Sequence, residues 1–372
     1  MRKQSLFHIS KRDTLPLGKA LLIRGGILLL ALVFCGLITT LLTGENPISV
    51  YGTILKGAFG TPRKNWVTWQ NVAVLLGISL AVTPAFKMRF WNIGGEGQFI
   101  LGAVAAAAVA FKAGPLLPQP VTLVLMCLAA MLAAGLYGAL TAALKVKFGT
   151  NETLMTLMLN YVALYFLTFL AETKASWNFF LEPTSARPIF TKFSDLASFP
   201  SLMIGKFGLN VCVILTFAVG ALVFLYLKYT KHGYEIAVVG DSAGTARYAG
   251  MKVGRIVLRT VFLSACLIGL AAAFKVGTAG ILSAAITDDV GWTGIIVAWL
   301  AKMSTAGIFL VSALISMLQY GSTAAAATFS QVDSSFADML QGAILFLVLA
   351  ADFFTRFRVV PSAKGGNSNG NG

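Results

Sequence analysis

Residues 121–144, VTLVLMCLAAMLAAGLYGALTAAL, form an apolar run of 24 residues without a charged side chain. At the 1.5 Å rise of an α-helix this run is about 36 Å long, whereas the hydrocarbon core of a membrane is about 30 Å thick. A helix on the surface of a soluble protein would need a charged or polar face toward water, and this stretch has none. The stretch therefore predicts a membrane-spanning helix.

Nine further stretches have the same character. The weakest lies within 277–302, where four glycines and the pair Asp288 and Asp289 interrupt the apolar run. Non-helical chain at that depth requires shielding by protein or a wet cavity, so we expect either a full span or a broken, re-entrant element. The fold class is predicted to be all-α: a polytopic membrane protein of about ten transmembrane helices, within a range of eight to ten. The expected spans are 20–43, 66–86, 91–111, 121–144, 151–170, 209–227, 256–276, 289–303, 306–327 and 339–355.

The composition of the 372 residues agrees with these runs. Apolar residues make up 57% and charged residues only 12%, against about 25% charged residues in soluble domains. This excludes an ordinary cytosolic enzyme, a disordered protein and a secreted disulfide scaffold, and continuous apolar runs argue against a β-barrel. The four cysteines all lie inside apolar runs, so we expect small core residues and neither a disulfide nor a metal site.

The basic excess predicts the orientation of the chain in the membrane. The net charge is +15, from 29 Lys and Arg against 14 Asp and Glu. With ten spans and the N-terminus inside, 20 of the basic residues fall in cytoplasmic segments and nine in outer segments, which predicts that both termini are cytoplasmic. We therefore expect no nucleic-acid partner. The predicted organisation is a cytoplasmic N-terminal segment 1–19, a transmembrane domain 20–358 with an outer loop 171–208 and a cytoplasmic loop 228–255, and a disordered cytoplasmic tail 359–372.

Residues 90–98, FWNIGGEGQ, are unusual because polar groups and glycines begin an expected span. A carboxylate such as Glu96 is costly inside a bilayer, and glycine lets backbones approach closely. One interpretation is a hinge or a polar wall of a permeation path, to which Asn92, Gly94, Glu96 and Gln98 would contribute. The other is an interfacial turn in which Glu96 caps the start of its own helix.

The span that opens at residue 151 carries a second polar group. Asn151 is placed to cap the helix, with Glu152 in the first turn, where the helix dipole favours a negative charge. Asn160 lies deeper, and an amide there needs a partner, which is either a neighbouring helix or a substrate.

The loop 228–255 mixes basic, acidic and small residues. We expect one short amphipathic helix over 242–249 on the membrane face. The loop is either merely solvated or a docking element for a cytoplasmic partner. The candidate contact residues are Gly240, Asp241, Ala243, Ala246, Arg247, Tyr248 and Gly250.

Catalytic and nucleotide-binding motifs are missing from the sequence. Neither Gly18-Lys19 nor Gly205-Lys206 is followed by Ser or Thr, so there is no Walker A motif, and no G-x-G-x-x-G, H-E-x-x-H or G-x-S-x-G occurs. We therefore expect a chain that is not itself an enzyme and that binds no cofactor.

Three segments together resemble a known family. They are Asn92-Ile-Gly-Gly-Glu-Gly-Gln98, then Asn151-Glu152 followed by Thr156-Leu-Met-Leu-Asn-Tyr161, then Gly240 followed by Ala246-Arg-Tyr-Ala-Gly-Met251. In order and spacing they are similar to the permease subunits of ATP-binding cassette (ABC) importers in the branched-chain amino acid/ribose permease superfamily. Within it, the chain most resembles the nucleoside permeases that work with basic-membrane-protein-type lipoproteins.

The resemblance implies a type II importer subunit in a bacterial cell membrane. It implies that loop 228–255 docks on a cytoplasmic ABC ATPase, expected as a tandem two-domain protein that binds ATP and Mg²⁺. It also implies a second, related permease subunit or a second copy, a substrate-binding lipoprotein outside, and membrane lipid around the helices. The chain would then form half of a translocation path.

We thus expect a permease subunit of an ATP-driven importer, with nucleosides as the predicted substrate. The same architecture importing ribose, another simple sugar or a branched-chain amino acid is the alternative. An ion-coupled secondary transporter or channel would need intramembrane charges that bind the ion, and no mid-membrane acidic pair is evident. A membrane-embedded enzyme would need paired catalytic groups, which two histidines hardly supply.

Overall fold

The computed structural model describes residues 7–11, 17–205, 207–329, 338–339, 342–343, 346–347, 350 and 357–361. These residues form two compact units. The larger unit is Leu55–Gly321, and the smaller unit joins Met1–Ile54 with Ser322–Gly372. Each unit is described by itself below.

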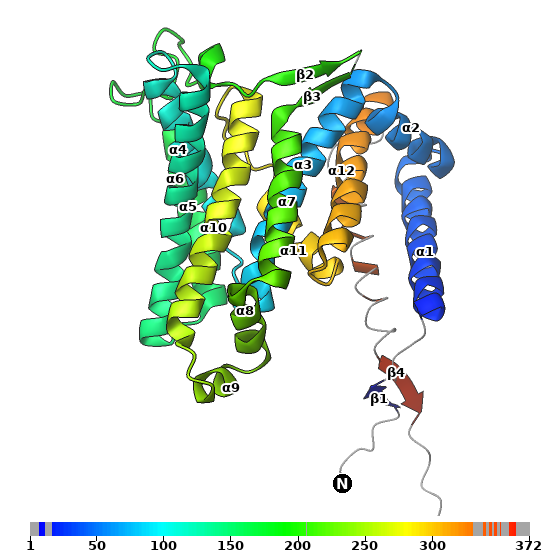
Figure 1. Ribbon diagram of the computed structural model, residues 1–372. Coiled ribbons are helices and arrows are strands. Elements are labelled where there is room, and N and C mark those ends of the chain that lie inside the picture. Colours follow the sequence, from blue (N-terminus) through cyan, green and yellow to red (C-terminus); the bar gives the residue numbers. More distant parts are fainter. Residues whose placement is uncertain are drawn as a thin grey trace, which may run out of the picture. The chain divides into compact units, whose positions relative to one another are not determined.

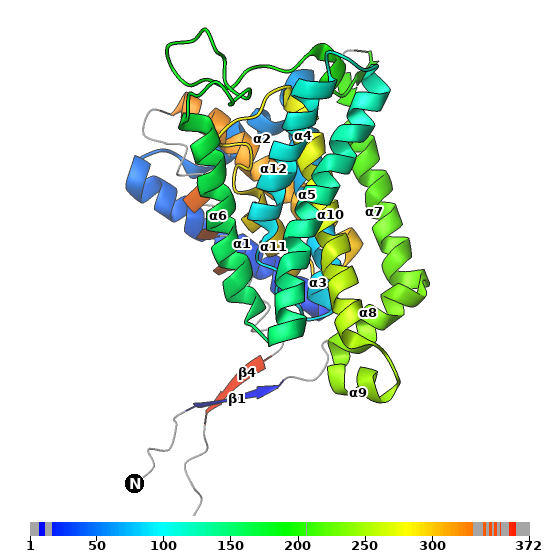
Figure 2. The same cartoon turned by 90° about the vertical axis from the view of Figure 1, so that its left-hand side faces the viewer.

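The larger unit is a bundle of long helices that lie side by side (Figures 1 and 2). A hairpin of two four-residue strands lies at one end of the bundle, and two short helices lie at the other. The long helices are α3 (Pro62–Lys87), α4 (Gly95–Ala113), α5 (Gln119–Phe148), α6 (Glu152–Glu172), α7 (Val211–Tyr229), α10 (Val253–Ala279) and the first part of α12 (Thr305–Thr328). The short elements are η1 (Asp195–Ala197), β2 (Ser201–Ile204), β3 (Phe207–Asn210), α8 (Lys231–Asp241), α9 (Ala243–Tyr248) and α11 (Val290–Leu300).

The helical membrane fold predicted from the sequence is confirmed. Among the described residues, seven helices are long and apolar enough to cross a membrane: α3, α4, α5, α6, α7, α10 and α12. The expected span 20–43 corresponds to α1 (Leu17–Thr43). The expected span 339–355 lies largely outside the described residues. The total of about ten spans therefore stays a prediction.

Small side chains form the centre of the larger unit. On α4, Ala103, Ala106, Ala107 and Ala110 follow the spacing of one helical face, and all four are fully buried. They belong to an apolar core that includes Ala130 of α5 and Ala272 of α10. Because these side chains are no larger than a methyl group, the three helices approach closely, as helices in lipid must to gain packing energy.

The weak eighth span is a broken element. The helix α10 ends at Ala279 and is followed by Gly280, whose φ of +67° is left-handed, and Ile281 then forms a β-bridge with Lys192 of the loop 171–208. The chain next runs without regular structure to α11, and Leu282 and Ile286 are buried on the way. At its other side, α11 packs its Gly294 against Ile78, in the middle of α3. An eleven-residue helix spans only about 16 Å, so α11 covers about half the thickness of a bilayer.

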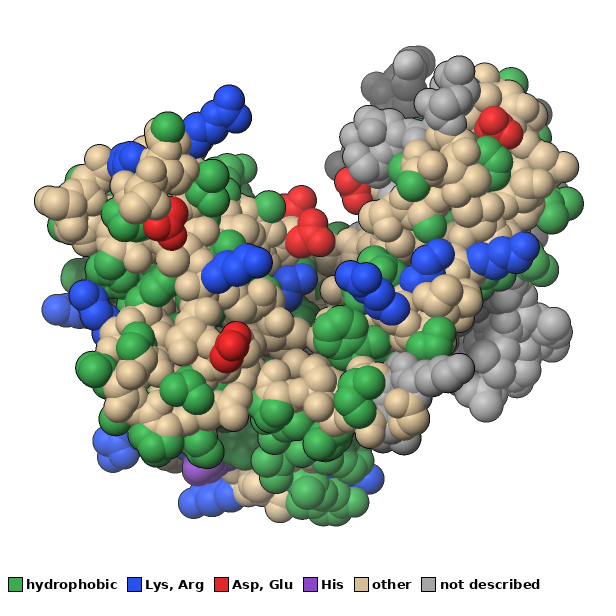
Figure 3. Space-filling model, turned by 90° about the horizontal axis from the view of Figure 1, so that it is seen from above, with side chains coloured by type: hydrophobic (Ala, Val, Ile, Leu, Met, Phe, Trp, Pro, Cys, Tyr) green, Lys and Arg blue, Asp and Glu red, His purple; other side chains and the backbone are tan. Residues whose placement is uncertain are grey.

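The predicted outer loop 171–208 lies between the end of α6 and the start of α7. It contains η1 and the hairpin of β2 and β3, which pair antiparallel from Ser201↔Asn210 to Ile204↔Phe207. The sequence did not predict this hairpin, because strands of four residues leave little alternation to detect. Figure 3 shows this end of the molecule, where acidic and basic side chains are scattered singly over a mostly uncharged surface.

The smaller unit contains α1, most of α2 (Pro47–Phe59) and a strand pair. The hydroxyl of Tyr51 on α2 donates a hydrogen bond of 2.7 Å to the carbonyl of Leu32 on α1, beside the buried Cys35. The strands β1 (Phe7–Lys11) and β4 (Phe357–Pro361) pair antiparallel, from Phe7↔Pro361 to Lys11↔Phe357. Residues 359–361 of the predicted disordered tail thus lie in β4, and the rest of the tail lies outside the described residues.

Candidate functional site

The turn that joins α3 to α4 is closed by its own amide side chains. Residues 90–94 precede the helix, so α4 begins at Gly95 rather than at residue 91 as expected. Asn92 and Gln98 form two reciprocal hydrogen bonds of 3.1 and 3.0 Å, and the Asn92 side-chain oxygen also accepts from the backbone N–H of Gly94 at 3.1 Å. Both side chains are buried. The amides therefore fix the shape of this turn.

Asn160 ties α6 to the same turn. Its side-chain oxygen accepts from the backbone N–H of Gly97 at 2.8 Å, and its amide donates to the carbonyl of Ile93 at 2.8 Å. One helical turn earlier, the hydroxyl of Thr156 accepts from the N–H of Ile93 at 3.2 Å. The sequence left open whether Asn160 meets a helix or a substrate. In this structure both of its polar atoms are satisfied by the backbone around the start of α4.

Glu96 contacts the start of α11. Its carboxylate accepts a hydrogen bond of 2.9 Å from the backbone N–H of Gly291, and its side chain is 5% exposed. A Cβ on Gly291 would collide with this carboxylate, so only glycine fits at this position. One of the two interpretations of the sequence was that Glu96 caps its own helix, in whose first turn it lies. The structure places its carboxylate on the N-terminus of a second helix as well, where the partial positive charge stabilises it.

An aromatic stack holds the opposite end of α11. The rings of Trp299 and Trp91 are stacked with centroids 4.9 Å apart, and Phe86 packs edge-on against Trp299 with centroids 6.3 Å apart. The half-helix is therefore fixed at both ends by residues that flank the α3–α4 turn. The polar groups of Asn92, Gln98, Asn160 and Glu96 bond to one another or to the backbone. This arrangement favours the hinge interpretation of the motif over a polar wall that faces a substrate.

The start of α6 is the helix end that Asn151 and Glu152 were expected to stabilise. The side-chain oxygen of Asn151 accepts from the backbone N–H groups of Thr153 and Leu154, at 3.0 and 3.2 Å. Glu152 lies in the first turn and forms an ion pair of 2.8 Å with Lys145 of α5. Both residues therefore stabilise the join between α5 and α6.

The region 228–255 folds into α8 and α9, and part of it is packed against the bundle. Gly240 on α8 lies against the carbonyl of Lys87 at the end of α3, with no room for a Cβ. Ala246 on α9 is fully buried in an apolar cluster with Met88 and Phe90. These two candidate contact residues are therefore buried within the larger unit. They join α8 and α9 to the α3–α4 turn.

The other candidate residues of this region face outward. Tyr248 is 97% exposed, although large aromatic side chains are normally covered. The helix expected over 242–249 is observed as α9, Ala243–Tyr248, with its N-terminus capped by Ser242. The exposed candidates are Asp241, Ala243, Arg247, Tyr248 and Gly250. They form a surface at the end of the bundle opposite β2 and β3 (Figure 1).

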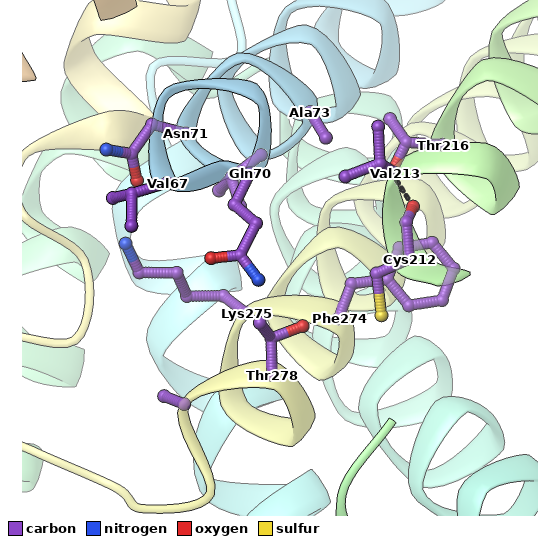
Figure 4. Close-up of a pocket in the computed structure, with 12 residues that line it drawn as sticks. Val67, Gln70, Asn71, Ala73, Cys212, Val213, Thr216, Phe274, Lys275 and Thr278 are labelled. Carbon is purple, nitrogen blue, oxygen red and sulfur yellow. Dashed lines mark hydrogen bonds between the residues drawn. The ribbon is translucent and has the colours of Figure 1, made fainter. Parts of the chain in front are cut away.

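A cavity of about 240 Å³ lies at the β2–β3 end of the bundle, between α3, α7 and α10 (Figure 4). Its polar lining includes Gln70, Lys275 and Thr278, none of which the sequence analysis singled out. Lys275 was counted as a charge outside the membrane, although the expected span 256–276 contains it. A lysine inside an apolar run was the signal that could have found this cavity.

Comparisons with known proteins place the chain in a family. The family model described as "Branched-chain amino acid transport system / permease component" matches residues 63–349. The chain belongs to this permease family. Its helical bundle, with a short-helix surface at one end, is thus that of an ABC transporter permease subunit, a multi-pass protein of the cell membrane.

Three relatives match this permease over most of their length. The nucleoside ABC transporter permease protein NupB of Lactococcus lactis is 28% identical, over 90% of this chain and 93% of its own. The glucose ABC transporter permease protein TsgB13 of Haloferax volcanii is 29% identical, over 89% and 87%. The guanosine ABC transporter permease protein NupP of Bacillus subtilis is 29% identical, over 87% and 91%.

A solved structure named as PsaBC from Streptococcus pneumoniae in complex with Fab is similar over 82% of this chain and 95% of its own, with a TM-score of 0.41 and 12% identity. Membership of the permease family implies that this subunit acts with an ATPase and a substrate-binding partner.

Proposed function

We propose that this permease subunit forms half of the translocation path of an ABC importer that moves nucleosides into the cell. The observation that carries the coupling part of this proposal is the packing of α8 and α9. Their buried residues Gly240 and Ala246 contact the end of α3, while Tyr248 is exposed for a partner. The substrate part rests on the relatives named for nucleoside and guanosine transport.

Motion of the ATPase reaches the bundle through this contact. ATP binding shifts the equilibrium of the permease only as far as the ATPase binds its two states differently. A displacement of α9 acts on Met88 and Phe90, which share its apolar cluster. Four residues after Met88 comes Asn92, whose bonds close the α3–α4 turn, and Glu96 then transmits the shift to α11. The turn and α11 act as the hinge of alternating access.

The partners of this subunit follow the same proposal. A tandem two-domain ABC ATPase binds ATP and Mg²⁺ and docks on Asp241, Ala243, Arg247, Tyr248 and Gly250, which are exposed. A second, related permease or a second copy completes the path, and a lipoprotein delivers substrate to the outer loop 171–208. Both termini, 1–19 and 359–372, then lie in the cytoplasm, as the distribution of Lys and Arg predicts.

Uptake by the assembled transporter tests the substrate. Cells or vesicles with the permease, its ATPase and its binding protein are given labelled guanosine, cytidine, glucose, ribose or leucine. We expect ATP-dependent uptake of the nucleosides, competed by unlabelled nucleosides and not by the sugars. Uptake confined to sugars or to leucine rejects the nucleoside assignment but agrees with an ABC importer permease. Uptake that persists after ATP depletion, with no ATPase co-purifying, rejects the ATP-driven mechanism.

Sugar import is the second candidate, because a relative named as a glucose permease matches as much of the chain as the nucleoside permeases do. The family description adds branched-chain amino acids. The uptake competition above separates all three classes in one experiment.

A further inference from the structure

The cavity between α3, α7 and α10 has one polar side and apolar walls. Gln70 and Asn71 on α3, with Lys275 and Thr278 on α10, supply the polar side. Thr216 on α7 also lines the cavity, and its hydroxyl donates to the carbonyl of Cys212. The walls include Val67, Val213 and Phe274, and the Phe274 ring is held edge-on by Phe199 at 5.6 Å between centroids. A volume of about 240 Å³ exceeds the room that one water needs many times over, so the cavity accommodates a small solute.

One polar group of this cavity, the side-chain amide of Gln70, lacks a partner among the described residues. The amide nitrogen of Gln70 is buried and, among the described residues, has no hydrogen-bond partner. In Figure 4 this amide points from α3 toward α10, and Lys275 extends from α10 toward Val67 and Asn71. Asp288 is the carboxylate whose charge acts on Lys275. A buried amide donor without a partner is costly, which indicates that something else binds here.

The arrangement of these groups selects among solutes. The edge of guanine or hypoxanthine presents two neighbouring acceptors, N7 and O6, which lysine recognises well. A glutamine amide adds a donor, and the flat faces of a base match walls made of Val and Phe. A hexose carries hydroxyls on every side and would desolvate several of them against these walls without a hydrogen bond. The lining thus favours a flat base with an acceptor edge over a sugar ring.

We propose that this cavity is a substrate subsite of the permease for the base of a purine nucleoside such as guanosine or inosine. Lys275 and Gln70 donate to the acceptor edge of the base, and Thr278 bonds to the nucleoside beside them. The inference rests on the proposed nucleoside import and adds to it the residues that contact the substrate. The cavity lies at the β2–β3 end, which the charge distribution predicts to be the outer end, where the nucleoside enters.

Substrate protection tests this subsite without relying on uptake constants, which also reflect the binding protein. In the full chain assembled with its partners in nanodiscs, Thr278→Cys provides a thiol in the cavity. A small water-soluble thiol reagent is applied, and mass spectrometry of the peptide containing position 278 separates this adduct from those of the four natural cysteines. Guanosine at ten times its dissociation constant leaves about one cavity in eleven empty, so modification is expected to slow about tenfold. Glucose at equal concentration is expected to have no effect.

Matched variants assign the effect to Lys275. In the Thr278→Cys background, Lys275→Met keeps an unbranched side chain of similar length but removes the charged donor. It is expected to raise the guanosine concentration needed for protection by about tenfold or more. Lys112→Met is the control, because Lys112 lies near the same end of the bundle on α4 and packs over the Phe179 ring, outside this cavity. It is expected to leave protection unchanged. Where Thr278→Cys does not assemble, Ala279→Cys, at the exposed rim of the cavity, replaces it.

Each outcome distinguishes this subsite from the proposed function. If the transporter takes up guanosine but guanosine does not protect a cysteine at position 278 or 279 from the thiol reagent, the subsite is rejected while nucleoside import stands. Equal protection by glucose rejects the purine assignment, and protection unaffected by Lys275→Met rejects the role of Lys275. A transporter that takes up no nucleoside rejects the proposed function itself.

Discussion

The carboxylate of Glu96 and the backbone N–H of Gly291 lie 2.9 Å apart, although 195 positions separate them in the sequence. The contact joins the first turn of α4 to the first turn of α11, so that the positive ends of two helix dipoles meet at one carboxylate. A charge that would be costly inside a membrane is thus held by the helices that it connects.

Removing this carboxylate should loosen α11. Glu96→Ala leaves the Gly291 N–H without its acceptor in a buried place, which costs about 1.5–3 kcal/mol. Glu96→Gln keeps an acceptor oxygen and should cost less. Thermal unfolding of the purified complex and substrate uptake measure both effects. Glu172→Ala, at the exposed end of α6, is the matched control and should change stability by less than about 0.5 kcal/mol. Equal stability of Glu96→Ala and Glu172→Ala would contradict the capping role.

Asn160 should stabilise the folded permease through its two hydrogen bonds to the backbone around the start of α4. Asn160→Leu has a similar size but leaves the Gly97 N–H and the Ile93 carbonyl unsatisfied, at a cost of about 2–5 kcal/mol. Asn160→Asp keeps the acceptor and should be intermediate. The same unfolding assay measures these effects, with Tyr161→Leu as the control, since Tyr161 is 48% exposed. If Asn160→Leu unfolds normally and only loses transport, Asn160 acts on substrate rather than on the turn.

The contact of Gly240 with Lys87 should control coupling. A methyl group at position 240 collides with the Lys87 carbonyl, so Gly240→Ala displaces α8 from α3. We expect the complex to hydrolyse ATP but to transport several-fold less. At Gly244 a Cβ would come no closer than 3.6 Å to any atom, so Gly244→Ala should be neutral. The ratio of transport to ATP hydrolysis is the measurement, and an unchanged ratio in Gly240→Ala would disprove transmission through this contact.

Tyr248 should contribute to the docking of the ATPase and little to the fold. Exposed aromatic side chains often carry a large share of the energy of an interface, so Tyr248→Ala should lower the amount of ATPase that co-purifies by tenfold or more (about 1.4 kcal/mol or more). Its own thermal unfolding should stay unchanged. The control is Tyr165→Ala, because Tyr165 is 68% exposed on α6, within a predicted span. Undiminished recovery of the ATPase with Tyr248→Ala would place the docking surface elsewhere.

The sequence predicted the helices of this fold well, because a membrane leaves a long apolar run few alternatives to a helix. It also singled out Asn92, Glu96, Gln98 and Asn160, since polar groups are conspicuous in an apolar context. The sequence could not identify the hydrogen-bond partners of these residues. The bond from Asn160 to Ile93 and that from Gly291 to Glu96 depend on which helices pack together, and no local pattern encodes that.

The cavity residues and the internal role of Gly240 were missed for different reasons. Lys275 is one of the nine basic residues counted in the outer segments, although the expected span 256–276 contains it, because counting charges by segment treats every lysine near a span end as exposed. Gly240 and Ala246 were expected to face a partner because they belong to a motif together with Arg247 and Tyr248. On a short helix, however, neighbours in sequence point to different sides, so Ala246 is buried while Tyr248 is exposed.

Because α11 covers only about half the thickness of a bilayer, an irregular segment of chain remains between α10 and α11, and this segment can change its length. A residue in extended chain covers about 3.3 Å and a helical residue about 1.5 Å. Winding four residues of the irregular segment before α11 into one more helical turn would therefore shorten the path by about 7 Å, and unwinding one turn would lengthen it equally. Tension between the ends of α10 and α12 can thus be taken up locally, without bending a long helix. Such winding would be visible as a change in deuterium uptake by the amides of 282–290 between the nucleotide states of the transporter.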